Sequence, residues 1–126
     1  MDNLLVISTK STPEIIFIPD GTLMIKGCCR PNDPSTFYAP VFDWLKRFRA
    51  VPSEKINLTI DVNYIDTPSS RCILQIIKTV AELNGNWIKA KIIWKYEFGD
   101  EDMFDQGKIF EIKTGFPFEF IEKPEE

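Results

Sequence analysis

Two segments of the chain alternate between apolar and polar residues, which is the pattern of a strand with one buried face. The first runs from about Lys55 to Ile65, and the second from Trp87 to Phe98. Parallel strands covered by helices on both sides are apolar throughout. The one-sided alternation therefore predicts helices that pack mainly on one face of a sheet. The other face would be solvated or would serve as a docking surface.

Further periodic segments complete the set of expected elements. The shorter strands should be Glu14–Ile18 and Thr22–Gly27, a hairpin around Pro19-Asp20-Gly21, and a last strand at Phe116–Phe120. The helices should lie within Ser35–Arg49, from about Thr67 to Leu83, and at Asp100–Lys113. Pro40 should either begin the regular part of the first helix or bend it. We expect an α/β fold with a mixed sheet of about five to six strands.

The length and composition predict one domain. The chain has 126 residues, 44% of them hydrophobic and 27% charged, which suits a globular protein with a core of ordinary size. No linker divides residues 1–126. Residues 1–12 should form an N-terminal arm or a short strand, and residues 122–126 a frayed acidic tail.

Several function classes become poor candidates on composition alone. The absence of histidine removes Ser-His-Asp and Cys-His catalysis and weakens any metal site, so we expect no enzyme, no metal and no cofactor. A net charge of −4 argues against a nucleic-acid partner. No apolar run could cross a bilayer, Met1–Leu5 does not resemble a signal peptide, and three cysteines suit a reducing compartment. We expect a cytoplasmic protein without membrane insertion.

The junction between the central strand and the second helix is the candidate regulatory site. Thr67 fits the N-cap position, Pro68 the first helical position, and Ser69 and Ser70 the first turn. A helix N-terminus favours anions, so a phosphate added here would find hydrogen-bond donors. Arg71, one turn along, is a candidate neighbour for that phosphate. The alternative is that Thr67 is simply a good helix cap.

Two other groups of residues suggest weaker candidates. The acidic residues around Asp100–Asp105 could hold a hard cation, although acids in a first helical turn are expected from the helix dipole. The aromatic residues of Ser35–Arg49 occupy more than one side of that helix, so Tyr38 and Trp44 could belong to a contact surface. Asp66 and Pro68, beside the candidate hydroxyl, are the other residues that we expect a partner to touch.

An ordered set of segments resembles the SiaC family of bacterial regulatory phosphoproteins. The segments are Val41–Leu45, Tyr64–Arg71, Trp94–Tyr96, Asp100–Met103 and Phe116–Phe120, and the resemblance extends from about Pro13 to Ile121. It implies a fold similar to STAS domains, the fold of anti-anti-sigma factors. Thr67 matches the threonine that is phosphorylated in the family's best-known member. Pro68 replaces a small hydroxyl residue, which keeps Ser69 and Ser70 as alternative acceptors, and Arg71 stands where the family often has lysine.

The resemblance also implies a function. A dedicated Ser/Thr kinase and a PP2C-type phosphatase would act on Thr67, and the unphosphorylated form would bind and activate a diguanylate cyclase. Cyclic di-GMP would rise and promote aggregation or biofilm formation. A second hypothesis keeps the switch but exchanges the target for an anti-sigma kinase, as in partner switching. A third is a small metal-dependent enzyme that uses the acidic cluster.

Overall fold

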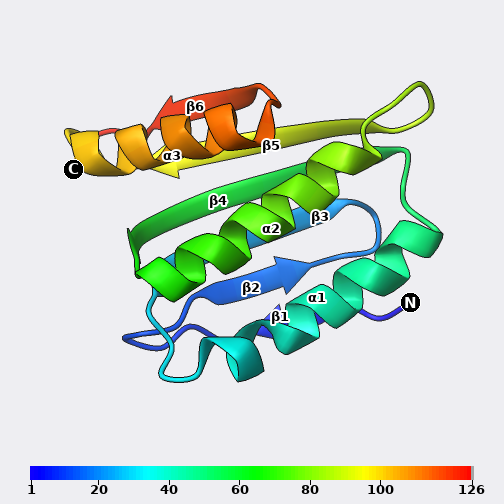
Figure 1. Ribbon diagram of the computed structural model, residues 1–126, viewed down its shortest axis with the longest axis horizontal. Coiled ribbons are helices and arrows are strands. Elements are labelled where there is room, and N and C mark those ends of the chain that lie inside the picture. The colour runs from blue at the N-terminus through cyan, green and yellow to red at the C-terminus, as the bar shows by residue number, and fades with distance from the viewer. Residues whose placement is uncertain (126) are drawn as a thin grey trace.

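A six-stranded sheet forms one layer of the molecule and three helices form the other, in the computed structural model, which describes residues 1–125 (Figure 1). The strands are β1 (Leu4–Val6), β2 (Glu14–Phe17), β3 (Thr22–Cys29), β4 (Lys55–Ile65), β5 (Lys89–Tyr96) and β6 (Phe118–Glu122). The helices are α1 (Pro34–Ala50), α2 (Thr67–Leu83) and α3 (Glu101–Thr114).

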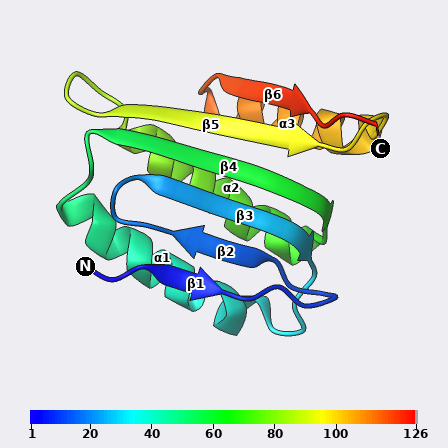
Figure 2. The ribbon, with the colours of Figure 1, turned by 180° about the vertical axis from the view of Figure 1, so that it is seen from behind.

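The strands lie in the sheet in the order in which they occur in the chain. β1, β2 and β3 pair antiparallel, whereas β3 to β6 are all parallel and are connected by α1, α2 and α3. Seen from behind, the sheet is uncovered, because all three helices lie on its other face (Figure 2). The predicted mixed sheet with helices on one side is confirmed. No helix in residues 1–125 has the length and apolar character needed to span a bilayer.

The predicted helix and strand boundaries lie within two residues of those in the structure, and the last strand, expected at Phe116–Phe120, is β6 at Phe118–Glu122. α1 begins at Pro34, earlier than expected, because the Asp33 carboxylate accepts the backbone N–H of Thr36 and caps the helix. Pro40 lies inside α1 on its exposed side and does not begin it. The strand expected at Trp87–Phe98 is shorter, so Trp87 belongs to the preceding loop.

The core lies between the sheet and the helices, and α3 packs closely on β5 at Gly107. A Cβ atom on Gly107 would lie 2.6 Å from the indole of Trp94, so only glycine fits at this position of α3. The indole Nε1 of Trp94 donates to the backbone oxygen of Met103 at 3.0 Å. The aromatic residue of β5 thereby fixes the position of α3.

The uncovered face of the sheet carries rows of polar side chains. β4 and β5 are neighbours, with Asn57 opposite Lys91 and Asp61 opposite Lys95. The Asp61 carboxylate pairs at 2.8 Å with Lys123, whose backbone N–H also donates to Tyr96. The expected fraying of residues 122–126 is therefore wrong for Glu122 and Lys123. Glu122 is the last residue of β6, and Lys123 is held by the two contacts just described. Glu126 lies outside the described residues.

Candidate functional site

The start of α2 is capped by Asp66, one residue earlier than the sequence pattern suggested. Asp66 has extended backbone angles, and its carboxylate accepts the backbone N–H of Ser69 at 2.9 Å. Its own N–H donates to the backbone oxygen of Cys29 at the end of β3. The predicted N-cap role of Thr67 is wrong, because the carboxylate already satisfies the donor that the threonine hydroxyl would have reached.

Because Asp66 caps α2, the hydroxyl of Thr67 is not needed for capping. Thr67 is the first residue of α2 and is exposed, and Pro68 beside it is also exposed. Pro68 therefore occupies the second helical position, where its missing N–H still costs no intrahelical hydrogen bond. The cap does not use the Thr67 hydroxyl, so a modification of that hydroxyl would leave the Asp66 hydrogen bond in place. Arg71 is exposed four residues further on, a spacing that puts it on the same side of the helix.

The two serines of the first turn differ sharply in exposure. Ser69 is completely buried, whereas Ser70 is half-buried. An enzyme could reach the Ser69 hydroxyl only after the first turn of α2 had opened. The structure therefore favours Thr67 over Ser69 among the predicted acceptors.

Directly beneath this turn lies a small group of buried polar side chains. The hydroxyls of Tyr38 and Ser69 are buried, and within residues 1–125 neither has a hydrogen-bond partner. Burial raises the pKa of the Tyr38 phenol, and the neighbouring Cys29 thiol adds to this effect. Burial also raises the pKa of Cys29 to about 12. The phenol and the thiol are therefore both neutral at physiological pH, and no charge lies under the junction from this group.

The structure contradicts two of the expected partner contacts. Tyr38 is 0% exposed and Trp44 is 2% exposed. Trp44 stacks on Phe48 at 4.9 Å between ring centroids, meets Phe17 edge-on, and donates from Nε1 to the backbone oxygen of Asp2. The apolar side of α1 is wider than its spacing suggested, because the N-terminal residues cover Trp44 and the start of α2 covers Tyr38. Asp66 and Pro68 remain accessible, half-buried and exposed respectively.

The acidic residues near α3 have structural roles. Asp100 caps α3 by accepting the backbone N–H of Met103 at 3.1 Å, and Glu101 and Asp102 follow in the first turn. In the part of the chain that the structure describes, no three carboxylate or thiolate side chains converge in a way that could hold a metal ion. The arrangement is that expected from capping and from the helix dipole.

One exposed aromatic residue was missed by the sequence reasoning. Trp87 was assigned to a strand face, but it lies in the loop between α2 and β5 and is 88% exposed. The turn residues Asn84 and Gly85, which end α2, were the signal that this loop continues beyond them. Tyr64, near the end of β4 and close in sequence to Thr67, is 52% exposed.

Comparison with known proteins places the chain among proteins of the same architecture. It is 25% identical over 119 residues to an uncharacterized protein of Pseudomonas aeruginosa strain UCBPP-PA14, covering 94% of each chain. Apo-SiaC from Pseudomonas aeruginosa superimposes with a TM-score of 0.84 at 24% identity, over 96% of this chain and 99% of that one.

A second solved structure with the same fold is a complex. It is described as the diguanylate cyclase SiaD in complex with its activator SiaC from Pseudomonas aeruginosa, and its matched chain has a TM-score of 0.84 at 24% identity. The match covers 95% of this chain and 99% of that chain. Residues 6–123 match the model of the SiaC family regulatory phosphoproteins. This match covers nearly the whole chain, and the protein therefore belongs to the SiaC family.

Proposed function

We propose that this protein is a non-enzymatic signalling protein that binds and activates a diguanylate cyclase and is switched off by phosphorylation of Thr67. The observation that carries the proposal is the placement of Thr67, which is exposed at the first position of α2 while Asp66 provides the cap. The family's description as regulatory phosphoproteins supports a modified hydroxyl. The complex of a relative with a cyclase supports the kind of partner.

The unphosphorylated surface suits a protein contact. Pro68, next to Thr67, exposes its ring, and Tyr64, near the end of β4, exposes its aromatic ring. Aromatic and apolar groups of this kind anchor protein interfaces, because they bury a large area at little cost in side-chain entropy. A cyclase that covers Thr67 would remove these groups from water.

A phosphate on Thr67 would oppose such a contact while leaving the domain folded. It adds nearly two negative charges at the positive end of a 17-residue helix, so the helix dipole and the exposed Arg71 would both favour it. A partner packed over Thr67 would have to bury the phosphate charge, which costs desolvation free energy, or place its own acidic groups beside it, which causes repulsion. The modification therefore weakens binding and spares the fold.

The switch requires two further proteins in the same compartment. We infer a Ser/Thr protein kinase that recognises the exposed first turn and a PP2C-type phosphatase that reverses its action. The three cysteines are free in the structure, which fits the reducing cytoplasm in which these enzymes work.

The test is to map phosphate on the protein isolated from its own cells. Mass spectrometry of the peptide that spans Tyr64–Arg71 should find partial occupancy on Thr67, which changes when the kinase or phosphatase gene is deleted. Purified unphosphorylated protein should then bind the cyclase encoded near those genes and raise its rate. Phosphate on Ser70 alone would move the switch to that residue, and no phosphate under any growth condition would contradict the proposal.

A further inference from the structure

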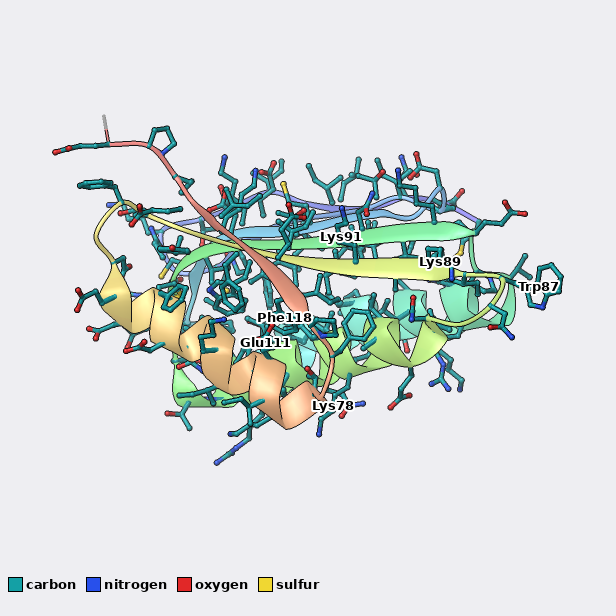
Figure 3. All side chains as sticks on the ribbon, turned by 90° about the horizontal axis from the view of Figure 1, so that it is seen from above. Lys78, Trp87, Lys89, Lys91, Glu111 and Phe118 are labelled. Atoms are coloured by element: carbon teal, nitrogen blue, oxygen red, sulfur yellow. The ribbon has the colours of Figure 1, made fainter. Side chains whose placement is uncertain are left out.

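The end of the sheet opposite Thr67 presents an exposed tryptophan beside a cluster of lysines. Trp87 is 88% exposed, whereas the other two tryptophans, Trp44 and Trp94, are buried. Figure 3 shows Trp87 projecting from the loop before β5, with Lys89 close to it on that strand. An indole that is exposed to this extent loses the gain that its burial would give, and tryptophan is enriched at protein interfaces.

The lysines beside Trp87 come from two neighbouring strands. Lys55 at the start of β4 stands directly opposite Lys89 at the start of β5, and Asn57 stands opposite Lys91. Together with Trp87 and Glu54, these side chains line a shallow depression of about 500 Å³. We call the set Lys55, Trp87, Lys89 and Lys91 the Trp87 surface.

The charges of the Trp87 surface are only partly compensated within the protein, by a hydrogen bond of 3.3 Å from the Lys89 ammonium to the backbone oxygen of Gly85 and by the Glu54 carboxylate that lines the same depression. Like charges directly opposite each other on adjacent strands destabilise a sheet, and Lys55 and Lys89 form such a pair. Within residues 1–125, neither is part of an ion pair closer than 4.0 Å, whereas Lys91 pairs with Glu119 at 3.6 Å. An anionic group between the first two would relieve the repulsion.

The loop that carries Trp87 is held in place before any partner arrives. Gly85 N–H donates to the backbone oxygen of Ile88, and the Asn84 side chain accepts the N–H of Ala90. The N–H of Lys89 donates to the backbone oxygen of Glu54, which ties the loop to β4. A preorganised loop loses little conformational entropy on binding, which is what an anchoring residue requires.

We infer that the Trp87 surface docks an acidic segment of a protein partner, with an apolar side chain of that segment covering the indole of Trp87. The charge of the surface selects carboxylates, and the exposed indole supplies the apolar area. Carboxylates of the segment would lie between Lys55 and Lys89. The surface is separated from Thr67 by the length of α2, about 25 Å for its 17 residues. The inference does not depend on phosphorylation or on the identity of the cyclase.

The test uses a short fluorescent peptide of glutamates around one phenylalanine, with binding to the whole protein measured by anisotropy at low salt. A peptide with lysines in place of the glutamates, and one with glutamates but no phenylalanine, are the peptide controls. We expect the acidic phenylalanine peptide to bind about tenfold more tightly than either control, and more weakly as salt is added. Because Trp87 is the exposed tryptophan, binding should also shield its fluorescence from acrylamide.

Variants separate this surface from general charge effects. Trp87→Ala and Lys89→Glu should each weaken the peptide about tenfold, whereas Lys46→Glu, an exposed lysine on α1, should not. Lys55→Glu should weaken the peptide yet raise the Tm by about a degree, because it replaces a cross-strand repulsion with an attraction. Equal binding of the acidic and basic peptides, or variants that bind like wild type, would overturn the inference. The inference would also be overturned if GTP or a single-stranded oligonucleotide bound more tightly than the acidic peptide and Lys89→Glu abolished that binding, since the surface would then be a nucleotide-binding site.

Discussion

Asp66 accepts the backbone N–H of Ser69 at 2.9 Å, and this hydrogen bond separates the residue that caps α2 from the residue that presents a hydroxyl to solvent. Capping and modification would conflict if Thr67 did both, since a phosphorylated hydroxyl would have to leave the cap. With the two functions on adjacent residues, phosphate can be added and removed while α2 keeps its first turn. The division suits a reversible switch.

The division of roles can be tested at Asp66. Asp66→Ala should lower the free energy of unfolding by about 1 kcal/mol, because α2 loses its cap, whereas Asp66→Asn should lose much less. A phosphate on Thr67 would lie next to the Asp66 carboxylate, so Asp66→Asn should also make the phosphorylated protein more stable relative to the unphosphorylated one. Chemical denaturation of both forms of each variant measures these differences. An equal loss in the alanine and asparagine variants would contradict the capping role.

Substitutions of Thr67 should change the switch and spare the fold. The free energies of unfolding of Thr67→Ala and Thr67→Glu should lie within about 0.5 kcal/mol of the wild-type value, because Thr67 is exposed and does not cap the helix. In a cyclase-binding assay, the alanine variant should bind like unphosphorylated wild type and the glutamate variant about tenfold more weakly. Enzymatically phosphorylated wild type is the stronger comparison, because glutamate carries only one charge. Tight binding by that phosphorylated protein would place the cyclase contact elsewhere.

The buried serine should not be needed for phosphorylation. Ser69 is completely buried with an unpartnered hydroxyl, so Ser69→Ala should be neutral or stabilising by up to about 1 kcal/mol. Quantitative mass spectrometry should find the same phosphate occupancy in Ser69→Ala as in wild type, and none in Thr67→Ala. A loss of phosphate in the Ser69 variant with Thr67 intact would show that the first turn opens for the kinase.

The sequence predicted the order and type of the elements because their signals are local. The alternation predicted a strand from about Lys55 to Ile65, which is β4, and Asp20-Gly21 marks the hairpin between β2 and β3. The resemblance indicated the family, which the match over residues 6–123 confirms. The one-sided alternation correctly placed the helices on a single face, since it reports which side of each strand is buried.

The errors arose where distant parts of the chain meet. Trp44 looked available on the helix spacing alone, but the backbone of Asp2, far away in sequence, accepts its indole N–H. Whether Asp66 or Thr67 caps α2 depends on backbone angles that both residue types tolerate, so composition could not decide it. Trp87 is exposed because β5 begins only at Lys89, a difference of two residues that no periodicity resolves.

The contact between α3 and Trp94 should make Gly107 sensitive to the smallest substitution. Gly107→Ala places a methyl group 2.6 Å from the indole, so it should destabilise the protein by about 1–3 kcal/mol despite the better helix propensity of alanine. Gly85→Ala is the matched control, because nothing lies within 4 Å of the added carbon. Denaturation midpoints of the two variants measure the difference. Similar midpoints would mean that α3 shifts freely on β5.

The buried thiol beneath the junction should make stability fall at high pH. Folding raises the pKa of Cys29 from 9.0 to about 12, mainly because burial disfavours the thiolate. A raised pKa contributes stability that is fully present below the unfolded value and is lost as pH rises through the folded value. The free energy of unfolding should therefore decline between pH 9 and about 12. The Tyr38 phenol, whose pKa is also raised, contributes to the same decline. Cys29→Ala removes the thiol's share together with the part of the Tyr38 pKa shift that the thiol causes, so the stability of the variant should fall less steeply over this range. Parallel curves for the two proteins would show that the thiol is not held neutral.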